Sequence, residues 1–152
     1  MLIEGSFNIA APQVRVWKKI TDAGLMAGCI PGCEAIEVVD DKTYKARVKV
    51  AVGPISARFD LVVEVTEEVA PERVVSVTRG DEGTRASMVS AENRLELKTL
   101  DDGTTEVTYA SEVSVTGRLG KFGLGVMKKK AQGLSEEFVR NFRAKVEAEA
   151  VS

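Results

Sequence analysis

The hydrophobic residues of this chain repeat with two different periods, and the first segment has the period of a strand. Residues Leu2–Ile9 alternate hydrophobic and polar side chains, which predicts a β-strand. A helix is expected to begin at Ala11-Pro12, because proline is tolerated in the first turn of a helix. Its expected hydrophobic stripe consists of three side chains at helical spacing: Val14, Trp17 and Ile20.

A second short helix and then a long series of strands are expected after this point. Asp22 can cap the second helix, and Ile30-Pro31-Gly32 is a strong stop signal. From there to about residue 118 the hydrophobic residues alternate with polar ones, and Gly53-Pro54 and Asp102-Gly103 mark tight turns. Strands joined by short turns form an antiparallel meander, in which one face needs a cover.

The last 30 or so residues return to helical spacing and can supply that cover. Their hydrophobic positions fall into two groups whose centres differ by about 100° around the helix axis. Gly125 and Gly133 lie near the change, so we expect a bend or an irregular turn between them. The predicted fold class is therefore α+β: a curved antiparallel sheet of about six or seven strands around a long C-terminal helix, with two short helices after the first strand.

Composition and charge restrict the function. A length of 152 residues favours a single domain spanning 1–152, and a net charge of −2 argues against nucleic-acid binding. No hydrophobic run approaches a membrane span, and no signal peptide is evident, so we expect a cytoplasmic protein.

The chain has no histidine and only two cysteines, Cys29 and Cys33. Catalytic triads based on histidine are therefore excluded, and a zinc site would lack its usual ligands. We predict no catalytic residue, no metal and no cofactor. The two cysteines are either a redox pair or, as is usual for cytoplasmic thiols, inert buried side chains.

Several short segments together resemble one known family. They are Ala11-Pro12, Val16-Trp17, Cys29-Ile30-Pro31-Gly32-Cys33-Glu34, Val52-Gly53-Pro54-Ile55, Ala57-Arg58-Phe59 and Gly117-Arg118-Leu119-Gly120. With this order of elements, the chain resembles the family of the G subunit of carbon monoxide dehydrogenase (CoxG), within the START/Bet v 1-like (SRPBCC, polyketide cyclase) superfamily. The resemblance implies a helix-grip fold that holds a lipid-like or quinone-like molecule. It also implies an accessory role beside a molybdenum carbon monoxide dehydrogenase, or alternatively a polyketide cyclase/aromatase activity in which Tyr109, Tyr44 or Arg85 would act.

The residues themselves point to a hydrophobic cavity between the sheet and the last helix. Aromatic residues make up only 5% of the chain, and glycines are frequent where the last helix begins, so the space between them is poorly filled. The expected lining comprises Ile30, Val48, Val50, Phe59, Leu61, Val77, Val89, Val113, Phe122, Val126 and Met127, with the polar residues Arg79, Arg85, Ser87, Asn93, Tyr109, Ser111 and Lys130.

Some of these polar positions have two interpretations. The arginines are either part of the cavity rim or solvated ends of strands, and Lys130 either reaches the cavity mouth or belongs to a solvated helix face. The basic run Lys128-Lys129-Lys130, with Arg118 and Lys121, is either such a face or a contact with an anionic membrane.

Overall fold

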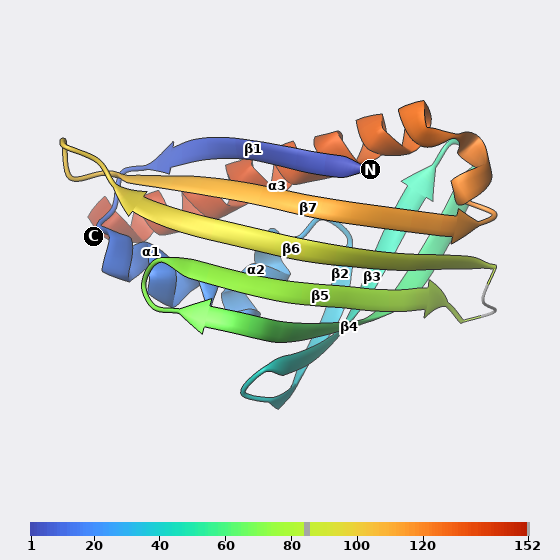
Figure 1. Cartoon of the computed structure of the whole chain (residues 1–152), viewed down its shortest axis with the longest axis horizontal. Helices are drawn as coiled ribbons and strands as arrows, with labels where there is room; N and C mark the ends of the chain where they lie inside the picture. The colour runs from blue at the N-terminus through green and yellow to red at the C-terminus, as the bar shows by residue number, and fades with distance from the viewer. Residues whose placement is uncertain (84–85, 152) are drawn as a thin grey trace.

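The protein, seen in a computed structural model that describes residues 1–83 and 86–151, is a curved seven-stranded antiparallel sheet that holds a long helix (Figure 1). The strands are β1 (Leu2–Ile9), β2 (Cys33–Asp40), β3 (Thr43–Val52), β4 (Ile55–Val69), β5 (Arg73–Glu82), β6 (Ser87–Thr99) and β7 (Thr105–Gly117). Their order in the sheet is β1-β7-β6-β5-β4-β3-β2. The predicted meander is confirmed, because β2 to β7 follow one another across the sheet and β1 joins at the β7 edge.

Two short helices follow β1, as the sequence predicts. Helix α1 (Gln13–Ile20) starts after Pro12, and α2 (Ala23–Cys29) starts after Asp22, whose carboxylate accepts a hydrogen bond of 3.1 Å from the Leu25 N–H. The expected stripe of α1 is wrong at one position. Val14 is 58% exposed, and Val16 is buried in its place beside the expected Ile20.

The hairpin turns lie where glycine permits a positive φ. Gly53 (φ 57°) connects β3 to β4, and Gly103 (φ 83°) lies between β6 and β7.

The last helix, α3, runs without interruption from Leu124 to Val151. A single 3₁₀ turn, η1 (Gly120–Phe122), precedes it, and Gly123 joins the two with a φ of 89°. The irregular turn that the sequence suggested between Gly125 and Gly133 therefore lies earlier in the chain. Glycine is required there because other residues rarely adopt this conformation.

Two separate hydrophobic cores lie under the two halves of α3. One contains Val16, Val107 and Phe142 and fills the space between α1, the sheet and the C-terminal half of α3. The other contains Phe59, Leu119 and Met127 and lies where α3 begins. The middle of the concave face, between these two cores, is where the structure leaves space.

Candidate ligand-binding site

The register of the sheet decides which side chains face α3. Val48 pairs with Phe59, and Val89 pairs with Val115, so these side chains share the concave face. The same face carries most of the predicted cavity positions, namely Val48, Val50, Phe59, Leu61, Ser87, Val89, Asn93, Tyr109, Ser111 and Val113.

Three predicted positions point elsewhere, and a fourth lies outside the described residues. Leu61 pairs with Gly80 on β5, so Val77 and Arg79 project from the opposite, convex face. Val126 is 49% exposed, because it lies on a side of α3 away from the sheet. Arg85 lies outside the residues that the structure describes.

The larger of two concave-face cavities lies beside α2, and we call it the α2 cavity. It has a volume of about 230 Å³. The helices contribute Ile20, Thr21, Ala23, Met26 and the following Ile30, and the strands contribute Ile36, Tyr44, Ala46, Val63, Val65, Glu68, Val74, Ser76, Asn93 and Leu95. Most of this lining is hydrophobic, and its polar groups come mainly from neighbouring strands.

The second cavity, the α3 cavity, lies under the first turns of α3 and has a volume of about 160 Å³. Its lining is Met1, Val48, Val50, Phe59, Leu61, Val89, Val113, Val115, Leu119, Met127, Lys130, Ala131 and Leu134. The two cavities are neighbours, since successive inward positions of β4, Leu61 and Val63, each line one of them. Phe122 lines neither cavity but packs against the core beside the α3 cavity.

A polar cluster lies on the concave face, and two of its members, Ser76 and Asn93, line the α2 cavity. The Asn93 amide donates hydrogen bonds to the Ser76 hydroxyl (3.3 Å) and the Thr78 hydroxyl (3.0 Å). The Asn93 carbonyl accepts one from the Ser111 hydroxyl (2.9 Å). Ser76 and Thr78 thus act as acceptors, and each keeps a hydroxyl hydrogen that can be donated to another group.

Two tyrosines flank this cluster. Tyr44 lines the α2 cavity, and Tyr109 lies over Gly5 on the concave face with its ring centroid 6.2 Å from that of Phe7. Burial raises the pKa of both phenols, and the Glu68 carboxylate near Tyr44 and the Glu136 carboxylate near Tyr109 raise it further. Both hydroxyls therefore stay protonated at neutral pH and can donate hydrogen bonds, but they are poor bases.

Ser87, on the same face, stabilises the fold. Its hydroxyl accepts a 3.1 Å hydrogen bond from the Leu119 N–H, and the adjacent Glu82 carboxylate forms an ion pair with Arg118. The Arg118 guanidinium donates a hydrogen bond to the Glu82 carboxylate and thereby lowers the pKa of Glu82, and a hydrogen bond from Ser87 lowers it further. Together these contacts tie the segment before η1 to the sheet, which fixes where α3 begins.

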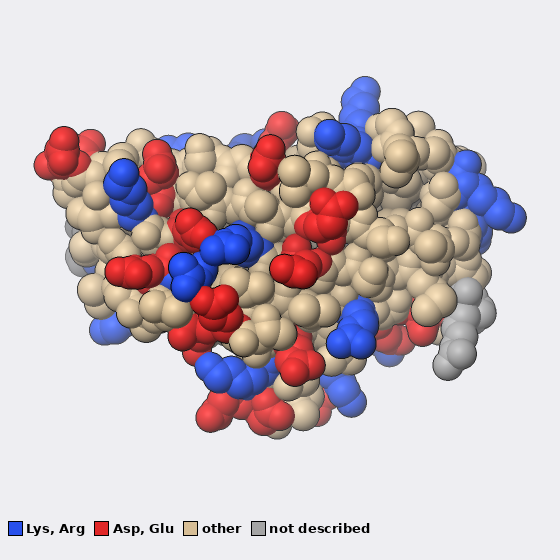
Figure 2. Space-filling model, viewed as in Figure 1, with Lys and Arg blue, Asp and Glu red and all other residues tan. Residues whose placement is uncertain are grey.

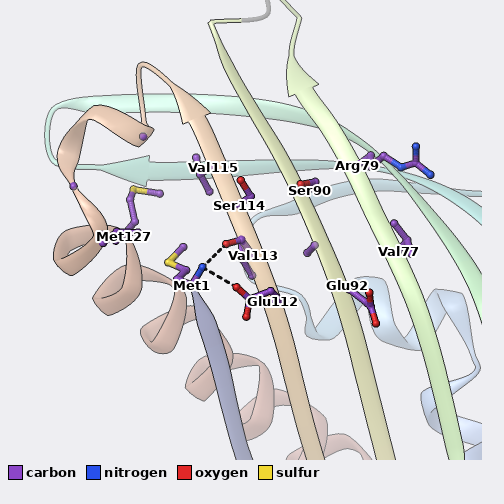
Figure 3. Close-up of a pocket in the computed structure, with 14 residues that line it drawn as sticks. Met1, Val77, Arg79, Ser90, Glu92, Glu112, Val113, Ser114, Val115 and Met127 are labelled. Carbon is purple, nitrogen blue, oxygen red and sulfur yellow. Dashed lines mark hydrogen bonds and ion pairs between the residues drawn. The ribbon is translucent and has the colours of Figure 1, made fainter.

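A groove of about 810 Å³ lies beside the α3 cavity and reaches across β7 to the convex-face residues Val77 and Arg79 (Figure 3). Met1, Val113, Val115 and Met127 line both spaces. The Met1 ammonium donates a 2.7 Å hydrogen bond to the Val113 carbonyl and pairs with Glu112 at 3.3 Å. Arg79 lines the far side of this groove and points away from Met127 in Figure 3.

The cysteines and acidic groups show no arrangement suited to a metal. Cys29 is fully buried, and this burial raises the pKa of its thiol, while Cys33 is half-buried and both are free. Within the described part of the chain, no three Cys, Asp or Glu side chains are grouped as metal ligands would be.

The comparison with known proteins identifies the family. The family model of the G subunit of carbon monoxide dehydrogenase (CoxG) matches residues 5–147. The chain belongs to the CoxG family. None of the curated proteins resembles the sequence closely enough to count as a match.

Several solved structures share the whole fold of this CoxG-family chain. A conserved protein from Geobacillus kaustophilus is 24% identical, with a TM-score of 0.88 over 96% of this chain and 95% of that one. A START superfamily protein from Mycobacterium smegmatis is 14% identical, with a TM-score of 0.77 over 97% of each chain. The Zhui aromatase/cyclase from Streptomyces sp. R1128 is 18% identical, with a TM-score of 0.69 over 99% of this chain and 95% of that one. The START-like helix-grip fold expected from the sequence is confirmed.

Proposed function

We propose that this CoxG-family protein is one ligand-binding domain that carries a hydrophobic small molecule, lipid-like or quinone-like, without transforming it. The observation that carries this proposal is the unfilled centre of the concave face, where two apolar cavities adjoin the cluster around Asn93. Pockets for small molecules are mostly apolar, with a few polar groups that fix orientation.

The size of the space supports a ligand that occupies both cavities. At about 230 and 160 Å³, each alone is smaller than the ~300 Å³ at which small-molecule pockets begin, whereas together they exceed that limit. We infer that a ligand displaces the side chains between them and extends from the α2 cavity to the groove beside β7.

The polar groups favour a ligand with a hydrogen-bond acceptor along its length. Ser76 and Thr78 keep hydroxyl hydrogens, and Tyr44 supplies another donor at the α2 cavity. In the described part of the chain, the cations among the residues that line the two cavities are Lys130 and the Met1 ammonium, and both lie at the α3 end. A neutral oxygen therefore suits the centre of the site better than a charged group does.

We infer that the partner protein is a carbon monoxide dehydrogenase or a related molybdenum hydroxylase, as the family description suggests. A cytoplasmic location is consistent with the two free cysteines, since thiols remain reduced there. Co-purification of tagged protein with the dehydrogenase from the native host tests this partner, and failure to recover any part of the dehydrogenase contradicts it.

A polyketide cyclase or aromatase is the alternative, because the Zhui aromatase/cyclase has the same fold. Tyr109 and Tyr44 would then be the catalytic candidates, but the raised pKa of each phenol keeps it protonated at neutral pH, so the phenolate needed as a base is scarce. Turnover of a poly-β-ketone that is lost in Tyr109→Phe supports this alternative, and no turnover at any pH argues against it.

Binding of a neutral fluorescent probe tests the carrier function. N-phenyl-1-naphthylamine should become fluorescent with the protein, and quinones or fatty esters should displace it. A protein that neither binds the probe nor retains any hydrophobic compound after purification contradicts the proposal.

A further inference from the structure

The convex face of the sheet has an exposed area of hydrophobic and small polar side chains. Val62 on β4 is 43% exposed and Met88 on β6 is 52% exposed, although both are large and hydrophobic. Two adjoining grooves, of about 810 and 650 Å³, cross this area, and we call them the convex grooves. They share four lining residues: Val77, Arg79, Ser90 and Ser114. Because exposed hydrophobic patches with a polar rim mark interaction sites, this area is a candidate interface.

Carboxylates that form no salt bridge within the described chain line the convex grooves. Two of them, Glu64 and Glu92, flank Val77 in the sheet register, and Asp81 lies on the same face of β5. Arg79 is the cation among them, and the salt bridges of the described residues do not include it either. Four other strand arginines each pair with a carboxylate: Arg47, Arg58, Arg73 and Arg94. Negative charge is therefore in excess along the convex grooves.

Exposed hydrophobic side chains with positive charge around them lie at the start of α3. We call residues 120–130, which comprise η1 and the first turns of α3, the α3 tip. Leu124 is 75% exposed and Val126 is 49% exposed, and neither contributes to the two cores. None of the described helices is long and apolar enough to cross a membrane. The tip also has three exposed lysines that take part in no salt bridge of the described residues: Lys121, Lys128 and Lys129. The charge of the α3 tip is thus opposite to that of the convex grooves.

The α3 tip and the convex grooves form one continuous surface. In Figure 1 the helices lie behind the sheet, so the same view in Figure 2 shows the convex face. Figure 2 shows Lys and Arg side chains at the upper right, over the start of α3, and Asp and Glu side chains nearer the middle, with a largely uncharged area beside them. The larger groove joins the two, since its lining includes both Leu124 and Glu92. Figure 3 shows Met127 of the tip on one side of this groove and Arg79 and Glu92 on the other.

This surface is complementary to a second copy of itself. A two-fold axis through the larger groove places the positive tip of one copy over the negative end of the groove in the other, and symmetry repeats the contact in reverse. Because one surface supplies both halves of the contact, the assembly closes at two copies and does not grow into a filament. Ser90 and Ser114 lie between the two ends in Figure 3, and their small side chains permit a second copy to approach closely.

From these observations we propose that the protein forms a symmetric homodimer in which the α3 tip of each copy packs in the convex grooves of the other. The exposed hydrophobic side chains of the tip leave water against Met88 and its neighbours in the second copy. The tip lysines lie near the carboxylates of Glu64 and Glu92 in that copy, so opposite charges meet across the interface. The dimer does not depend on a bound ligand, and this inference therefore goes beyond the proposed carrier function.

Sedimentation equilibrium of charge-reversed variants tests the dimer. The unchanged protein should shift from the mass of one chain, 16.4 kDa, to that of two between about 1 and 500 µM, and less readily as salt increases. The tip variant Lys128→Glu/Lys129→Glu and the groove variant Glu64→Lys/Glu92→Lys should each dimerise at least about tenfold more weakly, because like charges then meet. An equimolar mixture of the two variants should dimerise as the unchanged protein does, because both contacts of the mixed dimer again join opposite charges.

Matched variants separate this contact from charge and hydrophobicity in general. Lys45→Glu/Lys98→Glu reverses two exposed strand lysines outside the convex grooves, and Val14→Asn removes an exposed hydrophobic side chain of α1. Both should dimerise as the unchanged protein does, whereas Leu124→Asn should weaken the dimer about tenfold. The mass of one chain at every concentration, species that grow beyond two copies, equal losses in tip and control variants, or a mixture that stays monomeric would each overturn the proposal.

The same preparations distinguish the dimer from the carrier function. Thermal unfolding establishes that each variant is folded, so a loss of dimer is a loss of the contact. The tip and groove variants should bind N-phenyl-1-naphthylamine as well as the unchanged protein does, because the substituted side chains lie outside the two cavities. Probe binding by a protein that stays monomeric rejects the dimer alone, and a dimer without probe binding rejects the carrier function alone.

Discussion

Filling the α2 cavity should make the protein more stable and less able to bind a ligand. Ala46 is half-buried on β3 and lines this cavity, which has room for more atoms at about 230 Å³. Ala46→Leu adds three carbon atoms, and each buried methylene contributes about 0.8 kcal/mol, so the upper limit of the gain is ~2.4 kcal/mol. Imperfect fit reduces this value, and we expect about 1–2 kcal/mol.

Thermal unfolding and probe binding measure the two effects in the same sample. For a protein of this length, 1 kcal/mol corresponds to about 2–4 °C, so Tm should rise by roughly 2–8 °C. Affinity for N-phenyl-1-naphthylamine should fall at least tenfold, because the added side chain takes the space that the ligand needs.

Ala51→Leu is the matched control on the same strand. Ala51 is exposed and lies on the opposite face of β3, so the same added atoms are not buried there. Its stability should change by less than about 0.5 kcal/mol, with unchanged probe binding. If Ala46→Leu lowers the stability and leaves the affinity intact, the α2 cavity is not an available binding space.

Three further substitutions test the remaining parts of the structure. Asn93→Leu should leave probe binding intact but weaken binding of a quinone or ester severalfold in a competition assay, because the centre of the site loses its polar organiser. Phe142→Ala should cost about 3–5 kcal/mol in urea unfolding, because Phe142 is fully buried in the core under α1 and stacks on Phe138 with ring centroids 5.8 Å apart. Glu82→Gln should lower stability at pH 7, and the difference from the unchanged protein should shrink as the pH falls below about 4. The sign follows from the lowered pKa of Glu82, since the charged form paired with Arg118 stabilises the fold and is lost when the carboxylate is protonated.

For each of these three substitutions, one outcome would contradict the expectation. Equal loss of probe and ester binding in Asn93→Leu would mean that the cluster only supports the fold. Val14→Ala is the control for Phe142→Ala, and similar costs at these two sites would contradict the assigned core. A Glu82→Gln difference that persists at pH 2 would show that the ion pair with Arg118 is not its cause.

The sequence predicted the fold well because its local signals agree. Asp22 caps a helix where the hydrophobic period requires one, and Gly53 and Gly103 permit the turns that the alternation requires. The break before α3 was misplaced, because the shift between the two hydrophobic groups does not reveal which of several glycines adopts a positive φ. Only the structure identifies Gly123.

The site was harder to predict, and β5 shows why. The sequence predicted that Val77 and Arg79 face the cavity, but the concave face of β5 carries Val74, Ser76, Thr78 and Gly80. Sequence patterns assume that hydrophobic residues point inward, and this assumption fails where polar and small residues surround a cavity. The alternation of Ser76 and Thr78 along β5 was the only local sign that this face of the strand lines the cavity, and the same alternation also fits a solvent-exposed face. On β3 and β4 the alternation indicates the concave face more clearly, because Val48, Val50, Phe59 and Leu61 there are all large and hydrophobic.

Native mass spectrometry of the protein purified from its own source shows directly whether a hydrophobic molecule is bound. Carriage of a hydrophobic molecule predicts a 1:1 complex whose added mass disappears on organic extraction and is absent or strongly reduced in Ala46→Leu. A protein that has only the mass of its chain, and that takes up no quinone, ester or neutral probe when these are supplied, would show that it is not a carrier of hydrophobic molecules.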